Sequence, residues 1–231
     1  MKKLFFILTI LFFSHIEVSS AQTKCDQITY TPKLIFSTSY GKLRYDNSKG
    51  MKELTQLSQK HGMAEHGMFA AGLATVKVAW EVSVSTLVKK LDNKKNCVLP
   101  ATVEVFIGYE EPTIYLSRDL KPDTCEYNVV LRHEQTHQQI NKAALEYYIP
   151  ELKHHVKKIT HNIKPIEIKR TSETEVATGY LTQQYIESIY PLVEAFKREL
   201  VKEQNKLDNH SNYKLEGDLC AYYHKKVKNK K

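Results

Sequence analysis

An uninterrupted stretch of helix-compatible sequence places the strongest constraint on this chain. No proline or glycine occurs in residues 123–149, although these two residue types are the commonest interruptions of a helix. Apolar residues recur through residues 128–148, which read NVVLRHEQTHQQINKAALEYY. The stretch predicts a long helix that opens near Lys121-Pro122-Asp123. We expect it to end before Pro150, because the residue that precedes a proline disfavours the helical conformation.

The sequence HEQTH occupies residues 133–137 of this segment. Residues i and i+4 of an α-helix lie on the same face, so His133 and His137 can point two imidazoles at one metal ion. Glu134 lies about 100° further around the helix, within reach of a water molecule at that ion. In the H-E-x-x-H arrangement the histidines bind Zn²⁺ and the glutamate is the general base for the attacking water. The motif predicts zinc-dependent hydrolysis. The alternative is a solvated helix that carries two surface histidines and a glutamate with no metal-binding role.

The first 21 residues have the features of a secretory signal peptide. Lys2 and Lys3 precede a short apolar run, and Ser19-Ser20-Ala21 offers small residues for cleavage. The apolar run, residues 4–13, is too short to span a bilayer. We therefore expect an exported protein, periplasmic or secreted, with no integral membrane segment after cleavage. Residues 22–224 are expected to form one domain, and residues 225–231 a basic tail.

The formal net charge of +8 is partly concentrated in that tail, where five of the last seven residues are lysines. One interpretation is attraction to an anionic polymer of the cell envelope. The other is a frayed, solvated tail. The sequence contains no nucleic-acid-binding motif, so nucleic acid is not an expected partner.

Four cysteines follow the predicted signal peptide. Their even number and an oxidising compartment predict two disulfides, for which three pairings are possible. We favour Cys97–Cys125, which would close a pair of strands onto the start of the HEQTH helix. The second disulfide would then be Cys25–Cys220, joining the two ends of the mature chain.

Strands are predicted mainly from alternation. Val76, Val78, Trp80, Val82 and Val84 alternate with smaller or polar residues, which indicates a strand with one buried face. Further strands are expected at residues 28–38, where Pro32 favours an edge position, at 101–109 and at 113–116, with a turn at 110–112. The strand at 113–116 is the candidate edge for binding a peptide by β-augmentation.

Helices are predicted from apolar spacing at residues 51–61 and 151–161, with a loop at 61–67. A long C-terminal helix is expected to begin after a capping box at residues 172–175 and to continue to about residue 209. Pro191 is expected to kink or split this helix.

A catalytic zinc site needs three protein ligands and one open position. A third histidine six residues after His137 would complete one known pattern, but that residue is Ala143. Other candidates are His154 and His155, the acids Glu173 and Glu175, and Asp208 and His210 at the end of the last predicted helix. We favour His210, with Glu173 next. Tyr213 is a candidate hydrogen-bond donor to an oxyanion, but we favour a core or surface tyrosine at this position.

From about residue 52 to residue 220 the chain resembles a bacterial family called domain of unknown function 922, described as predicted secreted zinc-dependent proteases. The shared residues are Leu131, His133, Glu134 and His137 of an L-x-H-E-x-x-H motif, followed by Gln204, Asp208 and Ser211. This chain departs from the family pattern at Thr136, where the family often has glycine, and at Tyr213, where it tends to have histidine. If that distal histidine binds metal in the family, its role here passes to His210 or is lost.

The resemblance implies an α+β, zincin-like fold. In such a fold a small antiparallel sheet packs on the HExxH helix, and a long C-terminal helix closes the cleft. The implied cofactor is Zn²⁺, and the implied substrate is a peptide or protein.

Two other functions fit the sequence. One is a non-catalytic, zincin-like binding module of the envelope that keeps the helix but lacks a complete metal site. The absence of a signature for the third ligand favours it. The other is a disulfide-stapled envelope protein whose basic tail docks on anionic polymers, with HEQTH incidental.

Overall fold

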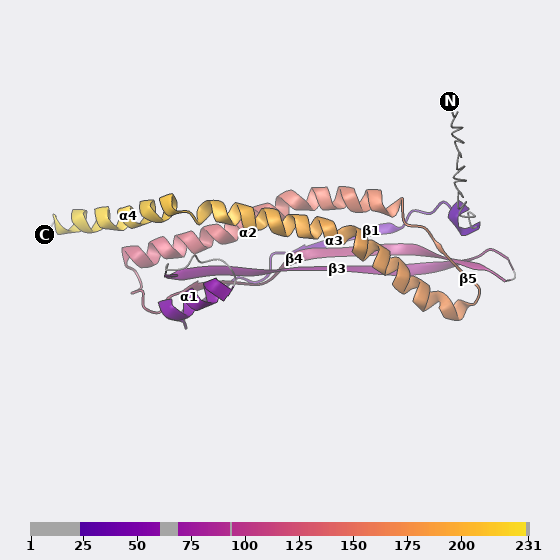
Figure 1. Cartoon of the computed structure of the whole chain (residues 1–231), viewed down its shortest axis with the longest axis horizontal. Helices are drawn as coiled ribbons and strands as arrows, with labels where there is room; N and C mark the ends of the chain where they lie inside the picture. The colour runs from indigo at the N-terminus through magenta and orange to yellow at the C-terminus, as the bar shows by residue number, and fades with distance from the viewer. Residues whose placement is uncertain (1–23, 61–68, 93, 230–231) are drawn as a thin grey trace, which may run out of the picture.

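The computed structural model describes residues 24–60, 69–92 and 94–229. The predicted signal peptide and the predicted loop at 61–67 lie outside these residues. The described chain is α+β, with one five-stranded sheet and four α-helices. It is elongated, and helices α2 and α3 run along the sheet (Figure 1). Among the described residues, no helix is both long and apolar enough to cross a membrane.

One long strand, β4 (Asn96–Leu116), forms the centre of the sheet. Strand β3 (Gly72–Lys90) pairs antiparallel with β4 along its whole length. Three short strands pair with β4 in succession and therefore occupy its other edge. They are β5 (Ile166–Ile168), which is antiparallel, and β1 (Lys33–Ser39) and β2 (Arg44–Asp46), which are parallel. The sheet is thus mixed, and the expected antiparallel sheet is not confirmed.

Residues 110–112 do not form the predicted turn. They lie within β4, at a β-bulge. Thr75 lies opposite Thr113 and Lys77 opposite Glu110, so the single residue Val76 faces two residues of β4. Glu111 takes a positive φ of 51° at this bulge. The predicted strand at 113–116 is consequently the end of β4, where β3 pairs with one edge and β2 with the other. It offers no free edge for a peptide, so it is not the β-augmentation site we expected.

Helix α1 (Met51–Lys60) agrees with its prediction, whereas α2 (Cys125–Thr160) is longer than expected. Helix α2 begins at a Thr124 cap, whose side chain accepts a hydrogen bond from the Tyr127 N–H, and it continues through Pro150. The predicted end before Pro150 and the separate helix at 151–161 are therefore wrong. A proline inside a helix costs about 3 kcal/mol. Burying a large apolar side chain contributes about 1.5–3 kcal/mol, and α2 buries Leu145, Leu152 and Val156 around this position.

Helix α3 (Thr174–Leu207) also continues through its proline, Pro191, and it changes direction along its length (Figure 1). The predicted capping box does not form. Residues Thr171–Glu173 make a short 3-10 helix, η2, and the Glu173 carboxylate accepts a hydrogen bond from the Lys169 N–H. A fourth helix, α4 (His210–Lys228), was not predicted. It includes the first residues of the expected basic tail in its last turn, so that segment is helical rather than frayed.

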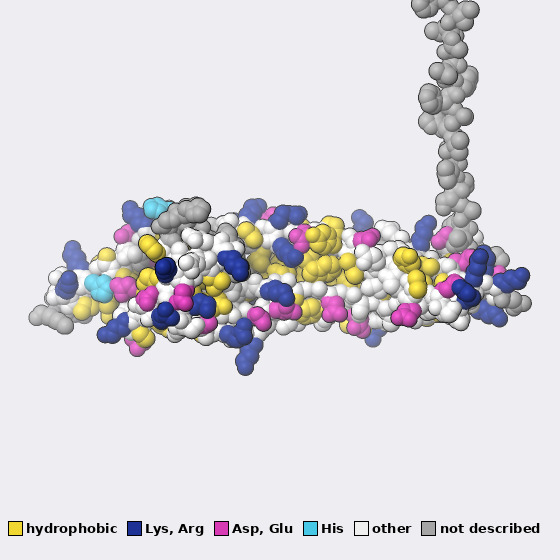
Figure 2. Space-filling view, turned by 60° about the horizontal axis from the view of Figure 1, so that its bottom comes forward, with side chains coloured by type: hydrophobic (Ala, Val, Ile, Leu, Met, Phe, Trp, Pro, Cys, Tyr) yellow, Lys and Arg dark blue, Asp and Glu magenta, His cyan; other side chains and the backbone are white. Residues whose placement is uncertain are grey.

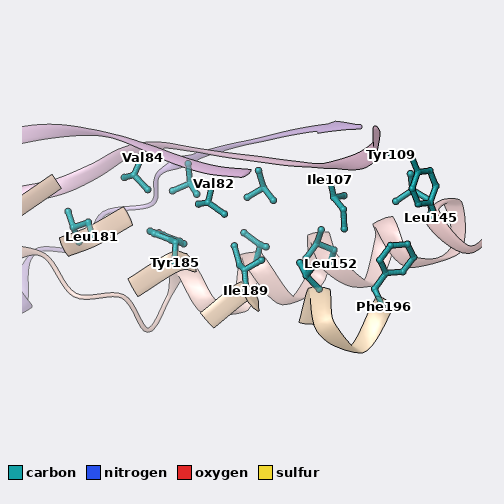
Figure 3. Close-up of a cluster of buried hydrophobic side chains, with 14 of the residues drawn as sticks. Val82, Val84, Ile107, Tyr109, Leu145, Leu152, Leu181, Tyr185, Ile189 and Phe196 are labelled. Atoms are coloured by element: carbon teal, nitrogen blue, oxygen red, sulfur yellow. The ribbon is translucent and has the colours of Figure 1, made fainter. Parts of the chain in front are cut away.

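The main core lies between one face of the sheet and helices α2 and α3 (Figure 3). The alternation predicted for residues 76–84 places Val82 and Val84 in this core, and Trp80 packs against it beside Tyr190. Helix α2 adds Leu145 and Leu152. Helix α3 adds buried residues at helical spacing, namely Leu181, Tyr185, Ile189, Val193, Phe196 and Leu200. This packing fixes α2, and with it the HEQTH motif, over the sheet.

Charges of both signs are interspersed over the face of the molecule in Figure 2, where apolar side chains gather near the middle. The lysines and arginines on this face do not form one continuous basic stripe. The high net charge therefore does not by itself define a binding surface for an anionic polymer here.

Two disulfides are present, as predicted, but their pairing differs from the one we favoured. Cys25 pairs with Cys97, and Cys125 pairs with Cys220. Alternation along β4 turns Cys97 and Leu99 away from the main core, toward the short 3-10 helix η1 (Lys24–Gln27) that carries Cys25. Cys125 is the first residue of α2 and meets Cys220 of α4. Two disulfides are compatible with an exported protein.

Candidate metal centre

Helix α2 carries three buried polar side chains in the predicted motif. His133, Glu134 and His137 are only 6%, 6% and 8% exposed. Charged residues and histidines are seldom buried to this extent without partners. The contacts of these three side chains therefore define the site.

Asp208 supplies a third potential ligand to the two histidines. It is the residue at which α3 ends, and its Oδ1 lies 3.1 Å from His133 Nε2 and 3.1 Å from His137 Nε2. The two Nε2 atoms are themselves 3.1 Å apart. Within the described residues, these side chains form the one group of His, Cys, Asp or Glu that could hold a metal ion.

The spacing of these three atoms fits a small tetrahedral cation. Zinc binds nitrogen and oxygen ligands at about 2.0–2.1 Å, which places neighbouring ligands of a tetrahedron about 3.3 Å apart. The triangle of 3.1 Å edges is close to one face of that tetrahedron. The residues present therefore fit a metal ion with little rearrangement.

The outer ring nitrogens explain why the two Nε2 atoms can act as ligands. His133 Nδ1 lies 3.1 Å from Glu216 Oε1, and His137 Nδ1 hydrogen-bonds Gln204 Oε1. A metal-binding histidine usually donates its other ring N–H to such an oxygen, which fixes the tautomer and leaves the facing nitrogen as an electron-pair donor. Two imidazole nitrogens and one carboxylate oxygen then converge. Three acceptors this close repel one another unless a proton or a metal ion lies between them.

Helix α4 contributes two side chains that contact this group. The Tyr213 hydroxyl donates to Asp208 Oδ1 at 2.6 Å, and its ring stacks on His133 with 5.3 Å between centroids. The Cys125–Cys220 disulfide joins α4 to the start of α2. One turn before Cys220, Glu216 contacts His133 as described above. The disulfide therefore helps to place both α4 side chains that contact this histidine.

The pKa values reflect burial and mutual charge. Burial raises the pKa of Glu134 to about 7, against the opposing influence of the two histidines. Burial alone would lower the pKa of His133, but the hydrogen bond to Asp208 and the charges of Glu134 and Glu216 raise it to about 9. Burial alone would raise the pKa of Asp208. Hydrogen bonds from His133, His137 and Tyr213 instead hold it well below its usual range.

Gly72, the first residue of β3, leaves space for the general-base candidate. A Cβ atom at this position would lie 2.6 Å from Glu134 Oε1 and 2.6 Å from Val130 Cγ1. Both distances are far below van der Waals contact. The start of β3 therefore packs directly on the Glu134 carboxylate because residue 72 has no side chain.

The structure does not bring His210 into the group that could hold a metal ion. His210 is the first residue of α4 and its side chain is exposed. Asp208, two residues earlier and also a candidate in the sequence, contacts both histidines instead. Glu173 contacts Lys169 and Arg170 at the start of α3. His154 is exposed and His155 is partly exposed, and both lie further along α2.

Sequence reasoning missed the supporting roles of Gln204 and Glu216. The family resemblance had already placed Gln204 beside Asp208 without giving it a role, and their spacing of four residues puts both on one side of the α3 terminus. Glu216 had no such signal, because α4 itself was not predicted.

Two surface hollows of about 410 and 250 Å³ lie beside α2. Arg132 lines both of them, Tyr45 and Gln135 line the larger one, and none of His133, His137 or Asp208 lines either. These hollows are distinct from the group that could hold a metal ion.

No family model, curated protein or solved structure matches this chain. The resemblance to the secreted protease family stays a prediction. We therefore infer the function from the geometry of the site.

Proposed function

We propose that this protein is an exported, zinc-dependent peptidase in which His133, His137 and Asp208 bind the metal and Glu134 is the general base. The observation that carries the proposal is the mutual 3.1 Å spacing of the two Nε2 atoms and Asp208 Oδ1. It supplies a candidate for the third ligand that the sequence left open.

The donor set supports zinc. Catalytic zinc sites commonly use two histidines and one carboxylate, with a fourth position left for water or substrate. Two histidines and a carboxylate also bind non-haem iron in some oxygenases. The glutamate directly after His133 favours hydrolysis, because H-E-x-x-H combines two ligands with a base on one helix.

Each residue has a distinct role in the proposed reaction. Zinc, when bound, would lower the pKa of a coordinated water and polarise the substrate carbonyl. Glu134 would accept the proton of the attacking water and pass it to the leaving amine. Burial raises the pKa of Glu134 to about 7 in the metal-free site, and a bound cation would lower it toward the ionised form that a general base needs. The Tyr213 hydroxyl donates its one proton to Asp208 Oδ1 and so orients this side chain. To act as the candidate donor to the oxyanion, it would have to release that hydrogen bond.

Fewer observations support the class of substrate than support the metal. A peptide or protein substrate is supported by the motif and by the family resemblance. An exported location is supported by the predicted signal peptide and by the two disulfides. The last turn of α4 carries Lys225, Lys226 and Lys228. They are the residues through which an anionic polymer of the envelope would bind.

The non-catalytic binding module is the competing function. Its main support in the sequence was the missing third ligand. Asp208 now contacts both motif histidines, which weakens that support without testing catalysis.

Metal analysis and a peptide library test the proposal together. Elemental mass spectrometry of the purified protein should find about one zinc per chain. His137→Ala should lose it, whereas His154→Ala, an exposed histidine on the same helix, should keep it. Glu134→Gln should keep zinc and lose peptide hydrolysis. Absence of zinc after supplementation, or full hydrolysis by Glu134→Gln, would overturn the proposal.

A further inference from the structure

We propose that the outer side of helix α4 binds an anionic phospholipid surface. Three apolar side chains, Leu215, Leu219 and Tyr222, form the contact with the lipid, and lysines of the same helix bind the phosphate headgroups. The inference goes beyond the proposed activity and does not depend on it, because it concerns the side of α4 that faces away from the candidate metal centre.

The inner side of α4 is fixed by its contacts with α2. Cys220, the buried residue of this helix, forms the disulfide with α2. Glu216 hydrogen-bonds His133, and the Tyr213 ring stacks on the same histidine. These three α4 side chains lie within about 60° of one another around the helix axis. They define the side of α4 that packs on the rest of the molecule.

The outer side of α4 carries an apolar stripe. Leu215, Leu219 and Tyr222 are 63%, 49% and 68% exposed. Their spacing of four and three residues places them next to one another along the helix. The stripe is centred roughly 130° around the axis from the inner side. Neighbouring exposed apolar side chains of this kind mark an interaction site, whereas single ones are ordinary on a protein surface.

Positive charge accompanies the stripe. Helix α4 carries four lysines and two carboxylates. One carboxylate, Glu216, contacts His133 on the inner side, so Asp218 is the one that remains on the rest of the helix. Lys225 and Lys226 follow Tyr222 by three and four residues and therefore continue the apolar stripe with positive charge. The outer side thus complements a surface that is both apolar and anionic.

The end of α4 projects so that it can meet a flat surface. Residues 221–229 are all exposed, and Figure 1 shows this end of the helix extending beyond α2 at the tip of the elongated molecule. Tyrosines such as Tyr222 suit the boundary between lipid and water, because the ring is apolar and the hydroxyl is polar. Lysines likewise bury their methylene groups while the charge stays at the headgroups.

A lipid surface explains the stripe and the lysines together. Leucine and aromatic side chains beside lysines are typical of helices that lie on anionic bilayers. An anionic polymer would need the lysines alone and would leave the stripe in water. A second copy of the chain would bring another helix with the same excess of positive charge. Three side chains on one helix also fall far short of the roughly 800 Å² that each partner buries in a stable complex.

Co-sedimentation with vesicles tests the proposal on the exported protein. Its N-terminus is first checked by mass spectrometry, because the apolar residues 4–13 would bind lipid by themselves. One set of vesicles contains phosphatidylglycerol and phosphatidylcholine, and the other contains phosphatidylcholine alone. Leu215→Gln/Leu219→Gln removes the stripe, and Lys225→Gln/Lys226→Gln removes charge.

Val176→Gln/Tyr180→Gln on α3 is the matched control for the stripe. These two residues are also four apart, and they are 62% and 64% exposed. The wild type and this control should bind the vesicles that contain phosphatidylglycerol and should not bind phosphatidylcholine alone. The leucine variant should bind roughly tenfold more weakly, because it loses apolar burial. The lysine variant should bind about 25-fold more weakly, at about fivefold for each lysine near an anionic surface.

Three results would overturn the proposal. The first is a wild type that does not bind, or that binds both sets of vesicles equally. The second is wild-type affinity in the leucine variant, which would mean that the lysines act alone, as they would on an anionic polymer. The third comes from sedimentation velocity without lipid. A wild-type dimer that Leu215→Gln/Leu219→Gln dissociates would assign the stripe to a second copy of the chain.

Discussion

The two disulfides allow a direct test of how α4 supports the metal centre. Cys125–Cys220 links residues 95 apart, and Cys25–Cys97 links residues 72 apart. The chain-entropy relation gives about 4.7 kcal/mol for the first loop and about 4.4 kcal/mol for the second at 25 °C. The loops do not overlap in sequence. Replacing either pair with alanine should therefore lower the free energy of unfolding by nearly the same amount.

The affinity for zinc should differ between the two double variants. Cys125→Ala/Cys220→Ala frees α4, which carries the Glu216 and Tyr213 contacts to His133. Losing these outer contacts should weaken zinc binding roughly tenfold or more. Cys25→Ala/Cys97→Ala loosens η1 from β4 and touches none of the ligands, so its zinc affinity should match the wild type.

Guanidinium unfolding of the metal-free proteins gives the two stability changes, and calorimetric titration with zinc under folding conditions gives the affinities. Equal loss of zinc affinity in both variants would mean that general destabilisation, rather than the placement of α4, controls the site. Wild-type zinc affinity in Cys125→Ala/Cys220→Ala would show that α4 docks without its disulfide. Either result would refute the positioning role that we assign to this bond.

Three further predictions concern the site itself. Asp208→Asn should weaken zinc binding by more than the roughly 10–100-fold typical of an outer partner, whereas His210→Asn should leave it unchanged, as measured by the same titration. Gly72→Ala should lower the rate of peptide hydrolysis without loss of zinc, because a Cβ atom would lie 2.6 Å from Glu134 Oε1. Steady-state kinetics, with the zinc content measured in parallel, checks this prediction. Zinc must displace the proton that His133 holds with a pKa of about 9. Zinc affinity should therefore fall as the pH is lowered below that value, by about tenfold per unit for one proton, and a pH-independent affinity would contradict this.

Local patterns were sufficient for the helix that carries the motif and for the strand that carries Trp80. Two short-range patterns predicted these elements: the i, i+4 spacing of His133 and His137, and the period-two alternation from Val76. The tertiary contacts agree with both patterns. The same local rules were wrong at Pro150, where apolar residues of α2 pack on the sheet on both sides of the proline. They were also wrong near Glu111, where they predicted a turn. There β4 continues through a bulge, because it pairs with β3 on both sides of the bulge.

The remaining errors concern which distant segments meet. Pairing of Cys125 with Cys220 depends on α4 running back along α2, and no feature near either cysteine encodes that path. The third ligand shows the same limit. Asp208 and His210 are both plausible ligands by type, and the choice between them depends on the backbone direction where α3 ends and α4 begins.

The contacts around the metal centre make its assembly depend on the C-terminal helices. Both histidines lie on α2, but the acceptor behind His137 is Gln204 on α3, the acceptor behind His133 is Glu216 on α4, and Asp208 joins those two helices. A ligand that binds only the assembled site stabilises the assembled state. Zinc at these three atoms would bridge α2 to the junction of α3 and α4, the helix that the Cys125–Cys220 disulfide also joins to α2. Docking of α4 and binding of zinc at this candidate site would therefore be coupled, and each should strengthen the other.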